Sequence, residues 1–131
     1  MIVGLGMDLV DIARVRALLA RHGERAAARL FTPGERAYAT RSVDPARHFA
    51  ARFAAKEALY KAFAGSPLAR RMSWQDAEVV NEADGRPTLR LHGCAAERMA
   101  ELGATAAWVT LTHADHVAGA TVVIEGTTPR D

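Results

Sequence analysis

The sequence predicts a single α+β domain, in which one long buried helix packs against a mainly antiparallel sheet. The chain has 131 residues, half of them apolar, which suffices for one hydrophobic core of ordinary size. Helix-capping signals concentrate in the first half, whereas short alternating segments separated by turn residues fill most of the second half. We expect the domain to cover residues 1–125 and residues 126–131 to form a frayed tail.

The first predicted elements are a strand and a bent helix. Residues 1–10 form a near-continuous apolar run, which is typical of a strand buried on both faces. Asp11 can cap the helix that follows, and Gly23 is expected to bend it. Apolar positions at spacings of four, three and four predict the buried face of this helix, formed by Val15, Leu19, His22 and Ala26.

Two further helices begin at capping signals. Thr32 precedes Pro33 and stands three residues before Glu35, which predicts a capping box and a short helix to about residue 41. Asp44 followed by Pro45 predicts the start of a long helix that ends near residue 64. Four large apolar residues and many alanines leave this helix little polar surface, so we expect it to be buried.

The second half of the chain is predicted to be mostly sheet. Asp84-Gly85 is a hairpin signal between two short strands, and a helix that ends at Gly103 follows them. The last two strands are expected to pair antiparallel across a turn at residues 114–116. The predicted strands are residues 77–81, 87–91, 107–112 and 117–124, and the predicted helix is residues 94–102.

Composition excludes several classes of function. The formal net charge of +2 is too small for a general polyanion binder, so we expect no nucleic-acid binding. No apolar run is long enough to cross a membrane, and the first residues lack the basic region of a signal peptide. Cys94 is the only cysteine, so a disulfide framework is impossible. These features predict a cytoplasmic protein.

Asp8 is unusual because it lies within the most apolar predicted strand. A buried carboxylate must be neutral, paired or bound to a cation, unless Asp8 instead lies at an exposed strand end. Gly4-Leu5-Gly6 begins like a dinucleotide-binding turn, but Leu9 occupies the place of the third glycine, so that motif is absent.

The predicted long helix carries charged residues within its apolar surroundings. Glu57 and Lys61 are four residues apart and could form a simple salt bridge, but this leaves Arg52 and Lys56 unexplained. Lys56 and Lys61 are also the only lysines of the chain. Three cations with one carboxylate favour a polyphosphate held by side-chain charge and by a metal ion.

The histidines and the cysteine give weaker signals. His113 follows Thr110-Leu111-Thr112 at a predicted strand end, where a lone histidine is more often structural than catalytic. We interpret Cys94 as a small buried residue. The remaining histidines are interpreted as surface or packing residues: His22, His48, His92 and His116.

Three segments resemble the signature blocks of the holo-acyl-carrier-protein synthases, which are short 4′-phosphopantetheinyl transferases. Residues 4–8 with Arg14 resemble the opening G-x-G-x-D block and its downstream arginine, and residues 31–35 resemble the F-T-x-x-E block. Residues 52–62 match R-F-A-A-K-E-A-x-x-K-A almost letter for letter. Residues 84–87 and 112–113 match two further positions, so the resemblance covers roughly residues 1–125.

The resemblance implies a 4′-phosphopantetheinyl transferase-like fold and an enzymatic function. The reaction would move the 4′-phosphopantetheine group of coenzyme A to a serine of apo-acyl carrier protein and release adenosine 3′,5′-bisphosphate, in support of fatty acid biosynthesis. Asp8 and Glu57 would bind Mg²⁺, and Lys61 would complete the catalytic set. Glu57 and a water molecule on the metal are both candidates for the base. The implied coenzyme A-binding residues are Arg52, Lys61, Gly85, Pro87 and His113.

The resemblance carries two further implications, and the sequence also differs from the family in two places. Glu35 would support the site from behind or orient a neighbouring chain. The family acts as a homotrimer with a site at each subunit interface, and a small chain with much apolar surface is consistent with that. The sequence departs from the family at residues 64–67, where Ala-Gly-Ser-Pro replaces a G-T-G turn, and at Thr110, where a serine is common.

A stripe of basic residues on the first predicted helix suggests where a carrier protein binds. The stripe follows helical spacing and adjoins the predicted buried face. Exposed arginines beside one leucine suit an acidic helix, although an ordinary solvated surface is the alternative. The predicted carrier-binding residues are Arg14, Leu18, Arg21 and Arg25, and the resemblance itself places a carrier contact at Arg14.

Two other functions fit parts of the sequence. A magnesium-dependent enzyme of another phosphoryl- or nucleotidyl-transfer class would also use Asp8, Glu57 and the nearby cations, and only the specificity of the third block argues against it. A non-catalytic binding module for an acidic partner would use the arginine stripe but would not need Asp8 or Glu57.

Overall fold

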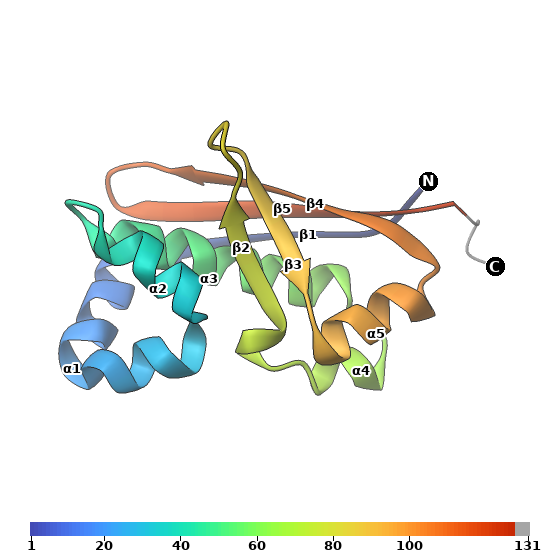
Figure 1. The fold of residues 1–131 in the computed structure, drawn as a ribbon, viewed down its shortest axis with the longest axis horizontal. Coiled ribbons are helices and arrows are strands. Elements are labelled where there is room, and N and C mark those ends of the chain that lie inside the picture. The colour runs from blue at the N-terminus through green and yellow to red at the C-terminus, as the bar shows by residue number, and fades with distance from the viewer. Residues whose placement is uncertain (128–131) are drawn as a thin grey trace.

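The computed structural model describes residues 1–127, and these form two antiparallel sheets with helices on one side (Figure 1). Strand β5 extends to Gly126, which the sequence assigned to the frayed tail, and residues 128–131 of that predicted tail lie outside the described part. The elements are β1 (Ile2–Asp11), α1 (Ile12–Leu30), α2 (Pro33–Thr40), α3 (Pro45–Ala62), α4 (Pro67–Arg70), the 3₁₀-helix η1 (Trp74–Asp76), β2 (Ala77–Asn81), β3 (Pro87–Leu91), α5 (Gly93–Glu101), β4 (Ala104–His113) and β5 (Val117–Gly126).

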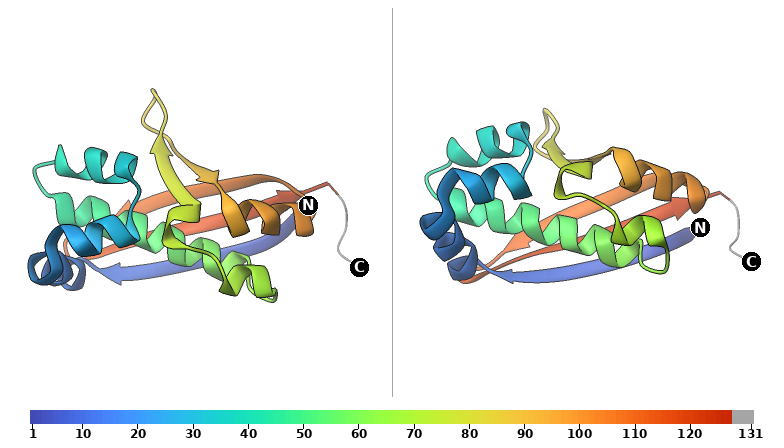
Figure 2. Two further views of the ribbon diagram at one scale, coloured as in Figure 1. Left: turned by 60° about the horizontal axis from the view of Figure 1, so that its bottom comes forward. Right: turned by 90° about the horizontal axis from the view of Figure 1, so that it is seen from below.

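The α+β architecture predicted from the sequence is confirmed. The larger sheet has the order β1-β5-β4, and β2 pairs with β3 in a separate hairpin at the predicted residues. Helix α3 lies along one face of the larger sheet (Figure 2). Helices α1 and α2 lie at one end of α3, and α4 and α5 lie at the other.

Glycine and alanine allow α3 to lie directly against β1. A β-carbon on Gly6 would stand 1.9 Å from the Ala58 carbonyl oxygen, and one on Gly4 would stand 2.5 Å from that of Ala62. Neither strand position could carry a larger side chain without moving the helix. The G-x-G pattern therefore serves close packing of backbone on backbone, and it brings Asp8, on the same face of β1, beside α3.

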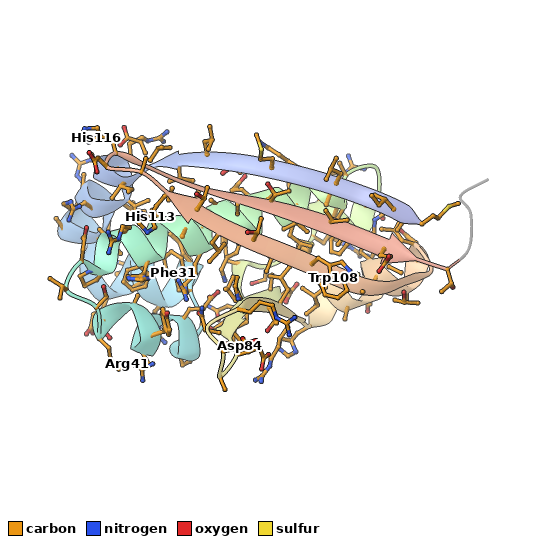
Figure 3. All side chains as sticks on the ribbon, turned by 90° about the horizontal axis from the view of Figure 1, so that it is seen from above. Phe31, Arg41, Asp84, Trp108, His113 and His116 are labelled. Carbon is orange, nitrogen blue, oxygen red and sulfur yellow. The ribbon has the colours of Figure 1, made fainter. Side chains whose placement is uncertain are left out.

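The prediction that β1 is buried on both faces is wrong for the single chain. Leu5, Met7 and Leu9 point away from α3 and are 64%, 60% and 63% exposed. Trp108 of β4 is 53% exposed on the same sheet, whose outer face no helix covers (Figure 3). The outer face of the sheet is therefore apolar. It is also uncovered, because all the described helices pack on the other face.

Helix α1 begins and bends where predicted, but its buried face is shorter than predicted. Asp11 accepts a hydrogen bond from the Ala13 amide at 3.0 Å, which caps the helix. Gly23 leaves the helical conformation with φ 55° and interrupts the 3.6-residue period. Val15 is buried, whereas His22, expected on the same face, is exposed beside this kink.

The two later helix starts differ in detail. The predicted capping box of α2 is present, with Thr32 and Glu35 exchanging hydrogen bonds. The Asp44 side chain, in contrast, does not cap α3. Its carboxylate lies 3.0 Å from the Arg16 guanidinium, whose hydrogen bond lowers the pKa of Asp44.

Two short elements and the burial of Cys94 also differ from the prediction. Helix α4 and η1 were not predicted, because four and three residues are too few to show a period. Cys94 is partly rather than fully buried. Within residues 1–127, no helix combines the length and the apolar character that a membrane span requires.

Candidate active site

Asp8 and Glu57 line one cavity of about 330 Å³ between β1, α1 and α3, which we call the carboxylate pocket. Asp8 comes from the inner face of β1, and Glu57 comes from the middle of α3. Its rim includes Arg14 and Leu18 of α1. The structure thus brings together the two predicted metal ligands, and the Asp8 side chain is only 17% exposed rather than at an open strand end.

The electrostatics of the carboxylate pocket favour a bound cation. Burial raises the pKa of Glu57, the negative charge of Asp8 raises it further, and Lys61 opposes the shift. No cluster of three or more possible metal ligands occurs in the described part of the chain. Two carboxylates that repel one another nevertheless fit Mg²⁺, which takes one or two protein carboxylates and completes its shell with water and substrate phosphate.

Lys61 lies next to Asp8 at the edge of this pocket. Its ammonium group donates hydrogen bonds to Asp8 Oδ1 at 3.1 Å and to the Met7 carbonyl oxygen at 3.0 Å. The side chain is 53% exposed. An ammonium group has three donors, so one remains for a phosphate oxygen of a ligand.

Lys56 does not belong to the cation cluster that the sequence suggested. Its ammonium group lies 2.8 Å from Glu35 Oε1 and donates to the Trp74 and Ala77 carbonyl oxygens at 2.6 and 2.8 Å. All three donors are therefore used within the chain, and the side chain is 3% exposed. Lys56 is a structural residue, although only five positions separate it from Lys61.

Glu35 supports the site from within its own chain. Its carboxylate is fully buried and, besides Lys56, accepts the amides of Thr32 and Val79, each at 2.9 Å. It therefore ties α2, α3 and β2 together, and β2 leads into the hairpin that carries Gly85 and Pro87. Of the two roles the resemblance left open, the geometry favours support from behind the site.

Four predicted coenzyme A-binding residues meet in a second cavity of about 240 Å³, which we call the arginine–histidine pocket. It lies between α2, α3, the β2–β3 hairpin and the end of β4, where Figure 3 labels His113. The predicted residues that line it are Arg52, Gly85, Pro87 and His113, and the lining also contains Tyr38, Arg47, His48 and Asn81.

Arg52 is the fixed cation of this pocket. It is 2% exposed, donates to Asn81 Oδ1 at 2.6 Å, and its guanidinium carbon lies 4.3 Å from the centre of the Tyr38 ring. Its Nε, like that of Arg47, is buried with no hydrogen-bond partner among the described residues. An unpaired buried donor is costly, so both arginines are suited to an anionic ligand.

His48, which the sequence interpretation assigned to the surface or to packing, packs edge-on against the Tyr38 ring and also faces a cavity. It lines the arginine–histidine pocket one turn before Arg52 on α3. Tyr38 and Asn81 were also missed, because their approach to α3 depends on how α2 and the hairpin pack. The spacing of four between His48 and Arg52 was the one sequence signal that could have linked His48 to this site.

The two pockets lie on different sides of α3. Glu57 follows Arg52 by five residues, which is about 140° around a helix of 3.6 residues per turn. The two pockets share no lining residue. Within one chain, Arg52 and Lys61 therefore do not face a common phosphate group, although the sequence placed both beside coenzyme A.

The predicted carrier-binding stripe is divided by the kink at Gly23. Arg14 and Leu18 line the carboxylate pocket, while Leu18 and Arg25 line an adjoining hollow of about 710 Å³. The stacked rings of Phe53 and Trp74, with centroids 5.1 Å apart, also line that hollow. Arg21 is exposed and lines neither cavity.

The atypical turn at residues 64–67 is held from α5. Arg98 donates to the carbonyl oxygens of Phe63 and Ala64 at 3.0 and 3.3 Å, and Ser66 caps α4 through the Leu68 amide at 3.2 Å. The arginine thus satisfies carbonyls that the end of α3 leaves free.

Known proteins share this fold and much of this sequence. A sequence profile described as the 4′-phosphopantetheinyl transferase superfamily matches residues 4–121. A holo-[acyl-carrier-protein] synthase of Methylobacterium radiotolerans is 50% identical over 129 residues, covering 95% of this chain and 94% of its own length.

Solved structures agree with the sequence comparison. The synthase of Neisseria meningitidis superposes with a TM-score of 0.83 at 28% identity, covering 95% of this chain and 99% of that one. The synthase of Bacillus anthracis, solved in complex with CoA (3′,5′-ADP), has a TM-score of 0.77 at 29% identity. The match covers 97% of this chain and 99% of that one. The chain therefore belongs to the 4′-phosphopantetheinyl transferase superfamily and, within it, to the holo-[acyl-carrier-protein] synthases. It is an enzyme of that transferase class.

Proposed function

We propose that this chain transfers the 4′-phosphopantetheine group of coenzyme A to a serine hydroxyl of apo-acyl carrier protein and releases adenosine 3′,5′-bisphosphate. The observation that carries the proposal is the meeting of Asp8, Glu57 and Lys61 at one pocket. Membership of the synthases supports the choice of substrates, because relatives of this chain are named for action on the carrier and one is solved with coenzyme A.

Asp8 and Glu57 would hold the magnesium ion, and Lys61 would bind a phosphate oxygen through its free donor. When bound, Mg²⁺ supplies charge neutralisation for the pyrophosphate of coenzyme A. The serine proton requires an acceptor, for which Glu57 and a water molecule are the candidates.

The adenosine end of coenzyme A would bind in the arginine–histidine pocket. Arg52 would contact a phosphate group, and Gly85, Pro87 and His113 would contact the nucleoside. The cavity of about 240 Å³ and the unpaired donors of the two arginines support this placement.

We infer that the active assembly is a homotrimer with sites between subunits. The two pockets lie on different sides of α3, so a neighbouring copy is needed to place both against one coenzyme A molecule. The uncovered apolar sheet face of Leu5, Met7, Leu9 and Trp108 supports association, since monomers rarely expose such a continuous patch.

The carrier protein would bind on α1, at the hollow beside the carboxylate pocket. Exposed arginines would attract an acidic partner, and Leu18 would give an apolar contact. The residues proposed for this contact remain Arg14, Leu18, Arg21 and Arg25. We further expect the reaction to serve fatty acid biosynthesis in the cytoplasm, which rests on the sequence resemblance and on the single cysteine.

Mass spectrometry of the carrier tests the proposed reaction. Apo-carrier incubated with this protein, coenzyme A and Mg²⁺ should gain the mass of one phosphopantetheine group. Asp8→Ala should abolish the gain, while Glu97→Ala, an exposed carboxylate on α5, should not. A carrier left unmodified by the wild type would favour another phosphoryl- or nucleotidyl-transfer enzyme. If the wild type also binds the carrier no more tightly than Asp8→Ala does, the result would favour a non-catalytic binding module.

A further inference from the structure

His48 lies in the arginine–histidine pocket, and the proposed function gives it no task. Its ring meets the Tyr38 ring edge-on, with centroids 5.6 Å apart and an interplanar angle of 74°. The side chain is partly exposed to the cavity that Arg47, Arg52 and His113 also line. His48 therefore packs against the Tyr38 ring and lies in the same cavity as three other basic groups.

The groups that face His48 are cationic or neutral, with one exception. Helix α3 contributes Arg47 and Arg52, β4 contributes His113, and α2 contributes Tyr38. Among the described residues that line the pocket, the hairpin presents only neutral groups and no element presents a carboxylate. The exception is Asp44 before α3, and its carboxylate is already paired with Arg16 at 3.0 Å.

This arrangement keeps His48 neutral when no ligand is bound. Burial lowers the pKa of His48, and the positive charges of Arg52, Arg47 and His113 lower it further, while Asp44 raises it only weakly. A bound anion would reverse the balance, because a negative charge within a few ångströms favours the protonated ring. The ring would then donate from both nitrogen atoms.

A phosphate monoester is the anion that this pocket suits best. Two buried arginine Nε groups lack partners in the described residues, and a phosphate monoester offers three oxygens and up to two negative charges near neutral pH. Coenzyme A carries one such group, the phosphate on its ribose, whereas its pyrophosphate oxygens belong to diesters. The ribose phosphate also distinguishes coenzyme A from its dephospho form.

We propose that His48 is a further binding residue for the ribose phosphate of coenzyme A, and that it takes up a proton from solvent when this phosphate enters the pocket. The inference rests on the proposed placement of coenzyme A in the arginine–histidine pocket. It makes recognition of this phosphate dependent on pH, since the charged ring with two N–H donors binds the anion more strongly than the neutral ring with one. Affinity then rises as the pH falls, until His48 is protonated in the free protein as well.

Calorimetry with adenosine 3′,5′-bisphosphate, in buffers of different ionisation enthalpy at pH 6, 7 and 8, tests this proposal. His48→Phe keeps an aromatic ring beside Tyr38 but cannot be protonated. If binding raises the pKa of His48 by about one unit, the wild type should gain up to about tenfold more affinity than His48→Phe between pH 8 and pH 6. The titration of the ligand's own phosphate groups is common to both proteins and cancels in this comparison.

Three controls and one independent measurement complete the test. His48→Arg carries a permanent charge and should bind tightly with the flatter pH profile of His48→Phe. His92→Gln, at an exposed histidine before α5, should behave as the wild type. Dephospho-coenzyme A should bind the wild type and His48→Phe with the same pH dependence. An NMR titration of the His48 ring in the wild type needs no substitution, and its midpoint should rise when the bisphosphate is added.

Equal proton uptake by the wild type and His48→Phe, or an unchanged NMR midpoint, would overturn the role of His48 while leaving the proposed function intact. Failure of the wild type to bind either the bisphosphate or coenzyme A at any pH would instead overturn the placement of coenzyme A, and the inference with it. The two failures are therefore distinguishable.

Discussion

Lys56 and Lys61 lie on the same helix, and replacing each with methionine should have opposite consequences. Methionine keeps most of the length and the apolar stem of lysine but removes its charge. Lys56→Met should strongly destabilise the fold, because the ammonium group is buried and bonded only within the chain. Lys61→Met should leave the fold intact and weaken binding of coenzyme A, because the ammonium group lies at the open edge of the carboxylate pocket.

The magnitudes follow from burial. Lys56→Met leaves the fully buried Glu35 carboxylate without its counter-charge, and breaking a buried ion pair in this way costs about 3–5 kcal/mol. For a domain of this size, that loss lowers the Tm by about 10–20 °C. Lys61 is half exposed, so the loss of its ion pair with Asp8 costs at most about 1 kcal/mol. Its charge-assisted contact with coenzyme A is worth about 1.5–3 kcal/mol.

Thermal unfolding by circular dichroism and calorimetric titration of coenzyme A measure both effects. The double variant Glu35→Gln, Lys56→Met should recover part of the stability, since a neutral amide needs no counter-charge. A Tm for Lys56→Met within a few degrees of the wild type would refute the structural role of Lys56. Unchanged coenzyme A affinity in Lys61→Met would refute the assignment of Lys61.

Three further predictions concern Glu57, helix α1 and the apolar sheet face. Burial and Asp8 raise the folded-state pKa of Glu57, so ionised Glu57 lowers stability above that pKa. Glu57→Gln should thus raise the Tm of the metal-free protein at pH 8. This gain in Tm should vanish below the pKa of Glu57 in the unfolded chain, near about pH 4. An equal gain at pH 3 would show that ionisation of Glu57 is not its cause. Arg21→Glu with Arg25→Glu should raise the KM for carrier at least about tenfold, less so in high salt, with the KM for coenzyme A unchanged. Met7→Asp, on the apolar sheet face, should yield monomers in sedimentation and abolish transfer; a trimer of full activity would exclude this face as the interface.

Local signals in the sequence were sufficient for most of the fold. Thr32 and Glu35 predict a capping box because both partners lie within one turn, and Asp84-Gly85 predicts a hairpin because the turn conformation depends on those residues alone. The resemblance also predicts Asp8 and Glu57 as the metal ligands, and both side chains line one pocket in the structure. The G-x-G pattern stands in the sequence, but its role in close packing depends on the approach of α3 to β1, which is a tertiary contact.

By itself, the sequence determined the α+β class, the order of the main elements and the family, since these follow from short-range patterns and from a motif read in order. Only the tertiary structure decided which charged residues are available to a ligand. Lys56 and Lys61 look alike in the sequence, yet one is enclosed by Glu35 and backbone carbonyls and the other is half exposed. His48 acquires a role because α2, β4 and the hairpin close around it. Burial and electrostatic environment arise from segments distant in the chain, and no local pattern encodes them.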